Sequence, residues 1–289
     1  MLQQVIYPFR GAELGGSHVA TFTLARAIKD QHGAECVVLC PEGTVIAKEA
    51  EKAGLRVAAS GETPTGRNNL ATDIAWRNRR KAVLERETRG RNSVVHCNDI
   101  NTLRSWGLAA RMAGLGVAYH HHALNRMWWP PHLVSLAYPD AVIAVSDATR
   151  QAVQRWRGDA IKELNTFELD PGYCRKTARE ALRQANAWPQ DAVIVGWIGN
   201  FWERKRPQFF LNVAAELKRL DPRYRFVMFG RDGDYSAAEM RQLAAKYGVA
   251  AETALPGFRQ PVEANVACLD LLLAPAPREP FGRALVEAI

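Results

Sequence analysis

Residues 269–289 read LDLLLAPAPREPFGRALVEAI and contain the parts of a strand–loop–helix unit. The apolar run from Leu269 to Leu273 has the length of a strand and is followed by prolines. A helix is expected to open near the Phe281-Gly282 pair. Ligands of α/β folds sit at the carboxyl ends of strands, and helix N-termini favour phosphate. The stretch therefore predicts a buried strand followed by a phosphate or polyol site, bracketed by Glu279 and Glu287.

Strand-like and helix-like segments alternate along most of the chain. A helix is predicted from a cap at Ser17 to about Lys29, and another from Pro207 to Leu220. Short apolar runs of strand length occur at residues 5–7, 36–40, 94–96, 116–119, 141–145, 193–199 and 224–229. This alternation predicts an α/β fold of parallel sheets with helices on both faces.

The alternation breaks between Ile161 and Pro189, and this break divides the chain into two Rossmann-like domains. We place the N-terminal domain at residues 1–170 and the C-terminal domain at residues 171–289. A length of 289 residues, 47% of them hydrophobic, is sufficient for two separate cores.

The net charge of +8 favours anionic partners such as nucleotides, phosphates or an anionic membrane surface, or it reflects a solvated basic surface. Basic residues gather between Arg77 and Arg91, beside Trp76. Three interpretations of this cluster stay open: peripheral contact with an anionic membrane, binding of a charged acceptor, and a solvated helix face. The usual nucleic-acid recognition motifs are missing from the sequence, so no nucleic-acid partner is expected.

The cysteine pattern is typical of reduced thiols. The five cysteines are odd in number and include no CxxC pair, and Cys36 and Cys40 lie in a strand-like run as core residues. No metal site is therefore predicted. No apolar run approaches the ~20 residues of a membrane-spanning helix, and no signal peptide precedes the first strand. We expect a cytoplasmic protein, with peripheral contact at the inner membrane face left open.

Three polar stretches follow predicted strands. Gly15-Gly16-Ser17 lies between the first strand and the first helix, and His120-His121-His122 ends a later strand. The loop at residues 200–206 reads NFWERKR, and three cations in a loop suit a diphosphate. Each stretch also has an ordinary structural interpretation, as a tight turn, a structural histidine or a surface loop.

Taken together, the motifs resemble a known family. In chain order they are GGSHVATFTLARAI, VVHCND, YHHHALN, DAVIAVSDAT, VGWIGNFWERKRP, FVMFGRDGD and LDLLLAPAPREPFGRALVEA. This set resembles the retaining GT-B glycosyltransferases of group 1, family four, over nearly the whole chain. The C-terminal part is the most specific, because E-P-F-G followed by Glu287 is similar to the E-x7-E motif of that family.

The resemblance implies roles for particular residues. His122 would lie near the sugar at the reaction centre, Lys205 would bind the donor diphosphate, and Glu279 would hold sugar hydroxyls close to the reacting face. The remaining donor-binding residues would be Gly16, Asn200, Arg204, Phe281 and Gly282, with Glu287 on the ribose hydroxyls. The family needs no metal or other cofactor.

Two positions depart from the family pattern. Asn200 stands where Arg is common, which would leave charge neutralisation to Lys205 with help from Arg204 or Arg206. His18 stands where Glu is common after the double glycine, and this puts the acceptor contacts in doubt.

The resemblance implies a retaining transferase that moves a sugar from a nucleoside-diphosphate sugar, UDP favoured over GDP, to a lipid-linked or saccharide acceptor of the cell envelope or a polysaccharide. The alternatives are a GT-B sugar-nucleotide epimerase and a non-catalytic nucleotide-sugar-binding fragment. The family continues past the E-x7-E motif, so the second domain is expected to be incomplete at its C-terminus.

Overall fold

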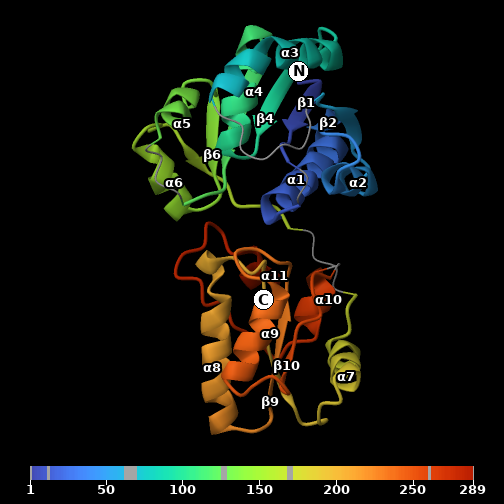
Figure 1. Ribbon diagram of the computed structural model, residues 1–289. Coiled ribbons are helices and arrows are strands. Elements are labelled where there is room, and N and C mark those ends of the chain that lie inside the picture. Colours follow the sequence, from blue (N-terminus) through green and yellow to red (C-terminus); the bar gives the residue numbers. More distant parts are fainter. Residues whose placement is uncertain are drawn as a thin grey trace. The chain divides into compact units, whose positions relative to one another are not determined.

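The computed structural model describes residues 2–11, 14–61, 70–124, 129–167, 172–259 and 262–288. The chain divides into two compact units, Met1–Phe167 and Glu168–Ile289, where the sequence had suggested a boundary after residue 170. Both units carry a parallel sheet between helices (Figure 1), so the prediction of an α/β protein with two Rossmann-like domains is confirmed. Each unit is described by itself.

The sheet of the N-terminal unit has, among the described residues, the strand order β3-β2-β1-β4-β5-β6-β7, with every neighbouring pair parallel. Its strands are β1 (Gln4–Pro8), β2 (Glu35–Cys40), β3 (Arg56–Ala59), β4 (Ser93–Cys97), β5 (Gly116–His121), β6 (Ala141–Ala144) and β7 (Ile161–Lys162). Its helices are α1 (Gly16–His32), α2 (Val45–Lys52), α3 (Leu70–Thr88), α4 (Ile100–Met112), α5 (Pro130–Ser135) and α6 (Asp147–Gln154).

Alternate residues of these strands enter different cores, because successive side chains of a strand point to opposite faces. Ile6 and Val95 pack in the core that α4 covers, whereas Val5 and Cys36 pack in the core that α1 and α2 cover. The predicted burial of Cys36 and Cys40 is confirmed.

The C-terminal unit has the strand order β10-β9-β8-β11, again parallel, within the described residues. Its strands are β8 (Val193–Ile198), β9 (Tyr224–Phe229), β10 (Thr253–Ala254) and β11 (Leu271–Leu272). Its helices are α7 (Arg175–Ala185), a 3-10 turn (Glu203–Lys205), α8 (Pro207–Leu220), α9 (Ala237–Lys246), α10 (Val262–Ala267) and α11 (Arg283–Glu287). The predicted bounds of α8 and β9 are confirmed.

The carboxyl ends of β8 and β9 approach each other closely. A Cβ atom added to Gly230 would lie 1.8 Å from the carbonyl oxygen of Gly199, so only glycine fits at position 230. The loops that follow these two strands are thereby held together at one edge of the sheet.

Two sequence predictions need correction. Helix α1 begins at Gly16 with Gly15 as its N-cap, so Ser17 is inside the helix and does not cap it. The apolar run at residues 269–273 forms only the two-residue strand β11, and the side chain of Leu271 is 54% exposed. In the described residues β11 pairs with β8 alone, which explains why the run is not the buried strand that its composition predicted.

Candidate active site

The C-terminal unit brings Lys205 and Glu279 together, although 74 residues separate them in sequence. Lys205 ends the 3-10 turn after β8, and Glu279 lies in the loop after β11. Because β8 and β11 are parallel neighbours, both loops leave the same edge of the sheet. The Nζ atom of Lys205 donates a short hydrogen bond to Oε1 of Glu279 and forms an ion pair with it. Two residues that the resemblance had assigned separately are thus in contact.

Burial and the charge of Glu279 shift the pKa of Lys205 in opposite directions. Its side chain is 23% exposed and that of Glu279 is 17% exposed. Burial lowers the pKa of Lys205, while the hydrogen bond and the negative charge of Glu279 raise it and Arg204 lowers it again. Burial thus disfavours the ammonium form of Lys205, and the carboxylate of Glu279 favours it.

The backbone of the lysine loop is anchored on both sides of Lys205. Trp197 donates its indole N–H to the carbonyl oxygen of Lys205 at 3.4 Å, and the N–H of Lys205 bonds the carbonyl oxygen of Trp202 at 2.8 Å. Arg206 follows in the left-handed region with φ 53°, which ends the turn and starts α8. These contacts hold the lysine at a fixed position beside the sheet.

Asn200 and Arg204, the other predicted residues of this loop, do not join the Lys205–Glu279 contact. The side-chain oxygen of Asn200 accepts from the N–H of Arg231 at 3.4 Å, and the Arg204 guanidinium lies 5.9 Å from the Trp202 ring centre. Asn200 therefore connects the loops after β8 and β9.

Phe281 and Gly282 precede the short helix α11. Gly282 has φ 79° and caps this five-residue helix, where its carbonyl oxygen accepts from the N–H of Leu285 at 2.9 Å. A residue with a Cβ would be strained in this conformation. Glycine therefore permits the turn that carries the chain from Glu279 into the helix.

Glu287 lies on α11 and forms an ion pair with Arg283, one helical turn earlier. The distance from Nη2 of Arg283 to Oε1 of Glu287 is 2.9 Å, and the Glu287 side chain is 8% exposed. Burial raises the pKa of Glu287, and the positive charge of Arg283 opposes that shift. The sequence did not single out Arg283, although a spacing of four residues is typical of helical ion pairs.

In the N-terminal unit, Gly16 is the first residue of α1, beside an unusual cap. The N–H of Gly15 donates to Nδ1 of His18 at 3.0 Å, and the His18 ring packs on Phe9 with 4.9 Å between ring centres. Burial lowers the pKa of His18. The histidine at the position where Glu is common thus closes the cap from inside the helix.

His122 follows β5 and belongs to a cluster of histidine rings. The ring centre of His120 lies 4.2 Å from that of His122 and 5.4 Å from that of His96, a residue of β4. His121 points the other way, where its Nδ1 lies 2.7 Å from the hydroxyl of Tyr119. Sequence reasoning missed His96, although it is the last residue but one of a parallel strand next to β5.

Burial is the largest cause of the low pKa values in this cluster, and for His96, His120 and His122 the neighbouring rings contribute to the same shift. The pKa is lowered to about 3 for His96, to about 4 for His120 and His121, and to about 2 for His122. These imidazoles are neutral at physiological pH, and each can donate or accept a hydrogen bond. Across the described ranges, no group of three His, Cys, Asp or Glu residues is placed to hold a metal ion.

The cluster gives the N-terminal unit a defined response to acid. The four histidines have pKa values below the ordinary value of about 6.5 when folded. Their contribution to stability is full above pH 6.5 and is lost as pH falls below it, by about 1.4 kcal/mol per pH unit for each group. We expect a lower urea midpoint at pH 5.5 than at pH 7.5, with the first loss of hydrogen-exchange protection in peptides of residues 93–121.

Two variants test whether the pH dependence of stability comes from the buried histidines or from any histidine of the chain. His120→Asn should reduce the pH dependence, whereas His32→Asn, at an exposed position, should leave it unchanged. A midpoint that stayed constant or rose between pH 7.5 and pH 5.5 would show that these rings are not held neutral by burial.

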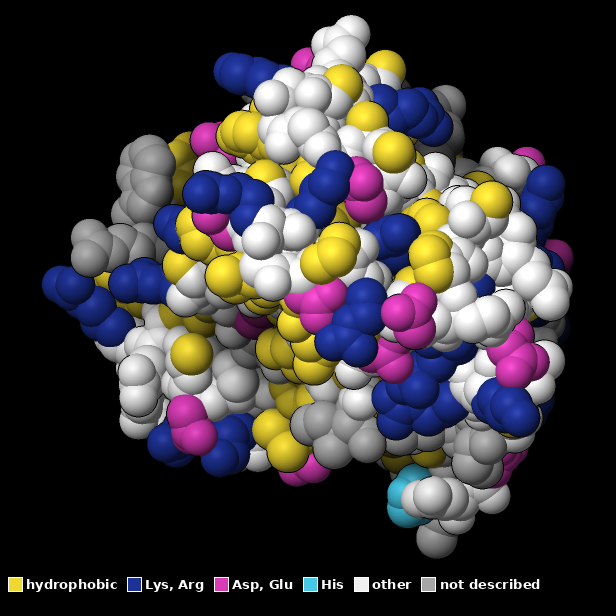
Figure 2. Space-filling view, turned by 90° about the horizontal axis from the view of Figure 1, so that it is seen from below, with side chains coloured by type: hydrophobic (Ala, Val, Ile, Leu, Met, Phe, Trp, Pro, Cys, Tyr) yellow, Lys and Arg dark blue, Asp and Glu magenta, His cyan; other side chains and the backbone are white. Residues whose placement is uncertain are grey.

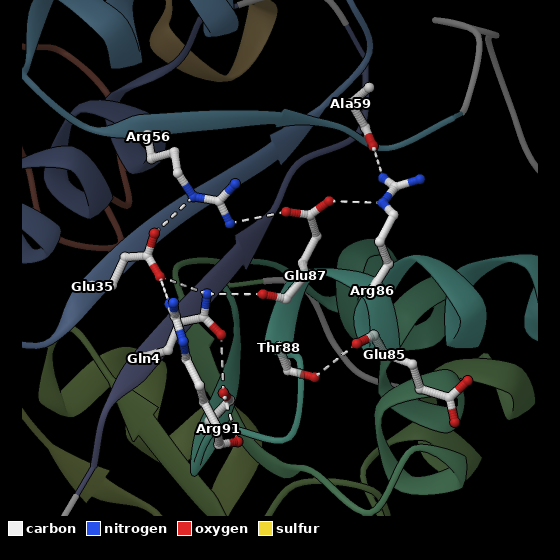
Figure 3. Close-up of polar contacts among 10 residues, drawn as sticks. Gln4, Glu35, Arg56, Ala59, Glu85, Arg86, Glu87, Thr88 and Arg91 are labelled. Carbon is white, nitrogen blue, oxygen red and sulfur yellow. Dashed lines mark hydrogen bonds and ion pairs between the residues drawn. The ribbon is translucent and has the colours of Figure 1, made fainter.

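Several residues of the predicted basic cluster at residues 77–91 form ion pairs: Lys81 with Glu85, Arg86 with Glu87, and Arg91 with Glu35 of β2. Arg91 and Arg56 both pair with Glu35, and the Arg56–Glu35 distance is 2.8 Å (Figure 3). Arg56 also pairs with Glu87 at 2.9 Å. Figure 2 shows another face, on which Lys and Arg side chains are interspersed with Asp and Glu side chains. Within the described ranges, no helix combines the length and apolar character needed to cross a membrane.

Comparisons with known proteins cover both units. The family model described as "Glycosyltransferase Family 4" matches residues 14–163, and that described as "Glycosyl transferases group 1" matches residues 178–289. EpsF of Bacillus subtilis (strain 168), provisionally named a glycosyltransferase, is 24% identical over an alignment of 302 positions that covers 99% of this chain and 76% of EpsF. The D-inositol 3-phosphate glycosyltransferase of Mycobacterium leprae (strain Br4923) is 28% identical over an alignment of 153 positions that covers 51% of this chain and 35% of that protein.

Two solved structures have a similar fold. Anabaena Alr3699/HepE, in complex with UDP and glucose, superposes with a TM-score of 0.78 at 18% identity, covering 99% of this chain and 78% of that chain. The glycosyltransferase of Rickettsia africae ESF-5 superposes with a TM-score of 0.74 at 15% identity, covering 99% of this chain and 76% of that one.

Proposed function

The chain belongs to glycosyltransferase family 4, within the group 1 glycosyl transferases, and we propose that it moves a sugar from a nucleoside-diphosphate sugar to an acceptor with retention of anomeric configuration. UDP is the proposed nucleotide, in preference to GDP, and the UDP in the structure of Alr3699/HepE supports this choice. The observation that carries the proposal is the contact between Lys205 and Glu279 at the edge of the second sheet.

The ion pair suits a leaving group that is a diphosphate. Negative charge develops on the β-phosphate as the bond to the sugar breaks, and a fixed ammonium group stabilises it. Lys205 is held by its loop, and Glu279 raises its pKa against the effect of burial. When the donor binds, the ammonium group exchanges the carboxylate for the diphosphate, and Glu279 becomes available to the hydroxyl groups of the sugar.

The residues around this pair complete the proposed donor site. The backbone N–H groups at Phe281 and Gly282 would approach the phosphates or the sugar, with Asn200 and Arg204 on the opposite loop. Glu287 would hold the ribose hydroxyls, which requires its carboxylate to accept hydroxyl hydrogens beside Arg283. Gly16 would contribute its N–H at the first turn of α1.

His122 is the residue of the N-terminal unit that we propose at the reaction centre. Because burial keeps its imidazole neutral, the ring can bond a sugar hydroxyl without placing a second positive charge beside an oxocarbenium-like centre. The proposed reaction therefore depends on Lys205 for charge and on His122 for orientation, and it uses no metal or cofactor.

The proposed acceptor is a lipid-linked or saccharide acceptor of the cell envelope or an exopolysaccharide. The proposed location is the cytoplasm, which the free state of all five cysteines supports. Peripheral contact with the inner membrane face stays part of the proposal, although Glu35 and Glu87 neutralise part of the basic surface.

A donor panel tests this function. The chain is incubated with UDP- and GDP-sugars, nucleotide release and sugar products are followed by mass spectrometry, and anomeric configuration is read by proton NMR. We expect UDP to raise the melting temperature by several degrees through linkage, UDP to be released from one UDP-sugar, and EDTA to leave the rate unchanged.

The same panel distinguishes the transferase from the epimerase and from the non-catalytic binding fragment. Isomerised nucleotide-sugar without UDP release would indicate the epimerase, and a thermal shift without turnover would indicate a binding fragment. The absence of both a shift and turnover with every nucleotide would contradict the proposal.

A further inference from the structure

Four aromatic rings form a continuous column in the N-terminal unit. The column starts at Tyr7 of β1, continues through His96 of β4 and His120 of β5, and ends at His122, which follows β5. Successive ring centres are 5.1, 5.4 and 4.2 Å apart. Because β1, β4 and β5 are consecutive neighbours in the sheet, the ring contacts cross three strands. The column therefore connects His122 to the interior of the first sheet.

The pleat of the sheet places these rings on one face. Cys97 and Tyr119 enter the core that α4 covers. Successive side chains of a strand point to opposite faces, so their sequence neighbours His96 and His120 point to the other face. Tyr7 packs in the core on that face, which α1 and α2 cover. The column thus belongs to the same side of the sheet as the first turn of α1.

Exposure increases along the column. Tyr7 is 0% exposed, His96 is 5% exposed and His120 is 6% exposed. His122 is more open than these three and is only partly buried. The column is therefore anchored in the interior and presents a single imidazole at its outer end.

No hydrogen bond at Nε2 orients the ring of His122 among the described residues. This atom is buried without a hydrogen-bond partner there, as is Nε2 of His120. The ring torsion of a histidine has a broad energy profile, so the side chain itself does not select one orientation. A functional histidine is commonly oriented by a hydrogen bond to its second ring nitrogen. At His122 the close contact with the His120 ring takes the place of that bond.

We propose that His120 is a positioning residue for His122. Its ring, supported from behind by His96, fixes the plane of the His122 imidazole and thereby the direction of its hydrogen bond to a sugar hydroxyl. His120 acts through His122 and has no contact with substrate in this proposal. The role rests on the proposed function of His122 at the reaction centre, but the orientation of the ring is measurable without turnover.

Two substitutions at position 120 separate ring contact from the filling of space. His120→Phe keeps a flat ring, whereas His120→Leu fills the space without one. We expect His120→Leu to lower kcat about tenfold at an unchanged KM for the donor, because small errors in the placement of a reacting group reduce rates strongly. His120→Phe should keep most of the kcat of the parent chain. Equal losses of kcat in the two variants would overturn the proposal.

A positioning residue has an effect only while the residue that it positions is present. His120→Leu is therefore also made in a His122→Ala chain, and residual turnover is followed over long incubations. We expect the double variant and His122→Ala to have equal kcat, because the effects of residues that act as a unit are not additive. A further loss in the double variant, as large as that of His120→Leu alone, would show that His120 acts independently of His122 and would overturn the proposal.

His121→Leu is the matched control. His121 is 1% exposed on the same strand, and its Nδ1 lies 2.7 Å from the hydroxyl of Tyr119 on the opposite face. The substitution removes a buried imidazole of the same size from outside the column. Its kcat should match that of the parent chain, with the fold of both verified by circular dichroism. A loss equal to that of His120→Leu would indicate a general disturbance of β5 and would contradict a specific role of His120.

Nuclear magnetic resonance measures the orientation of the His122 ring without turnover. Histidine is labelled with carbon-13 at Cε1, and the signal of His122 is assigned by its absence from His122→Ala. Relaxation dispersion reports exchange between ring orientations, whereas the chemical shift changes with any replacement of a neighbouring ring. We expect no exchange at His122 in the parent chain and in His120→Phe, and exchange in His120→Leu.

This measurement separates the positioning role from the proposed function. Absence of exchange at His122 in His120→Leu would overturn the positioning role, whatever the activity of the chain. Exchange in His120→Leu, together with no sugar transfer by the parent chain, would uphold the positioning of the ring and reject the transferase function.

Discussion

Lys205→Ala is expected to reduce kcat for sugar transfer by about 10²–10³-fold, the usual effect of removing one preorganised donor from a developing negative charge. The physical reason is the position of its ammonium group, which is fixed by the loop after β8 and favoured by the charge of Glu279. Nucleotide release from the donor, followed over time with saturating donor and acceptor, measures the change.

Lys218→Ala is the matched control for this variant. Lys218 is on α8 of the same unit, where its ammonium group pairs with Glu252 at 2.8 Å and bonds the carbonyl oxygen of Gly248 at 2.9 Å. It therefore loses an ion pair of the same kind at a position away from the lysine loop. Normal turnover by the Lys205→Ala variant, with its fold verified by circular dichroism, would exclude Lys205 from diphosphate binding.

Glu279→Gln is expected to lower kcat by about 10²-fold and to change the pH dependence of kcat/KM. The substitution keeps the shape of the side chain and removes its charge. Glu279 raises the pKa of Lys205 against the effect of burial, so without that charge the pKa of Lys205 falls further. Activity requires the ammonium form and is lost as pH rises through this pKa. The alkaline limb of the profile should therefore move to lower pH.

Glu252→Gln, in the ion pair between Lys218 and Glu252, is the matched control for Glu279→Gln. Glu252→Gln should leave both the rate and the alkaline limb unchanged, because Glu252 acts on Lys218 and not on Lys205. An alkaline limb at the same pH in the parent and in Glu279→Gln would mean that another group controls it, and that the contact between Lys205 and Glu279 is structural only.

Much of the fold could be predicted because local pattern and tertiary environment agree. The helix from Pro207 to Leu220 and the strand from Tyr224 to Phe229 have the predicted bounds, since a proline opens the helix and a continuous apolar run marks the strand. The run at residues 269–273 has similar composition, but its strand has two residues. Strand length depends on the pairing partners that a sheet supplies, and sequence pattern does not reveal them.

The first helix shows how one side chain changes a local prediction. Ser17 is a good capping residue by type, yet the helix begins before it at Gly16. The ring of His18 reaches back to the N–H of Gly15, and this contact requires the packing of His18 on Phe9. The capping propensity of Ser17 gives no information about this contact between His18 and Gly15.

The candidate site was predicted as separate residues, and their contacts needed the structure. The resemblance named Lys205 and Glu279, but their ion pair follows only from the adjacency of β8 and β11. His96 was missed because it lies in an ordinary apolar strand, and its place beside His120 depends on the pairing of β4 with β5. The basic run at residues 77–91 likewise gave no sign that Glu35 would neutralise Arg91.

The central claim is that the donor diphosphate binds in the C-terminal unit at Lys205. A crystal structure of the chain soaked with UDP tests it most directly. We predict a diphosphate oxygen at about 2.7–2.9 Å from Nζ of Lys205, as in other charge-assisted bonds, with Glu279 released from the ion pair and Glu287 beside the ribose. UDP bound elsewhere, with Lys205 still paired to Glu279, would contradict the claim.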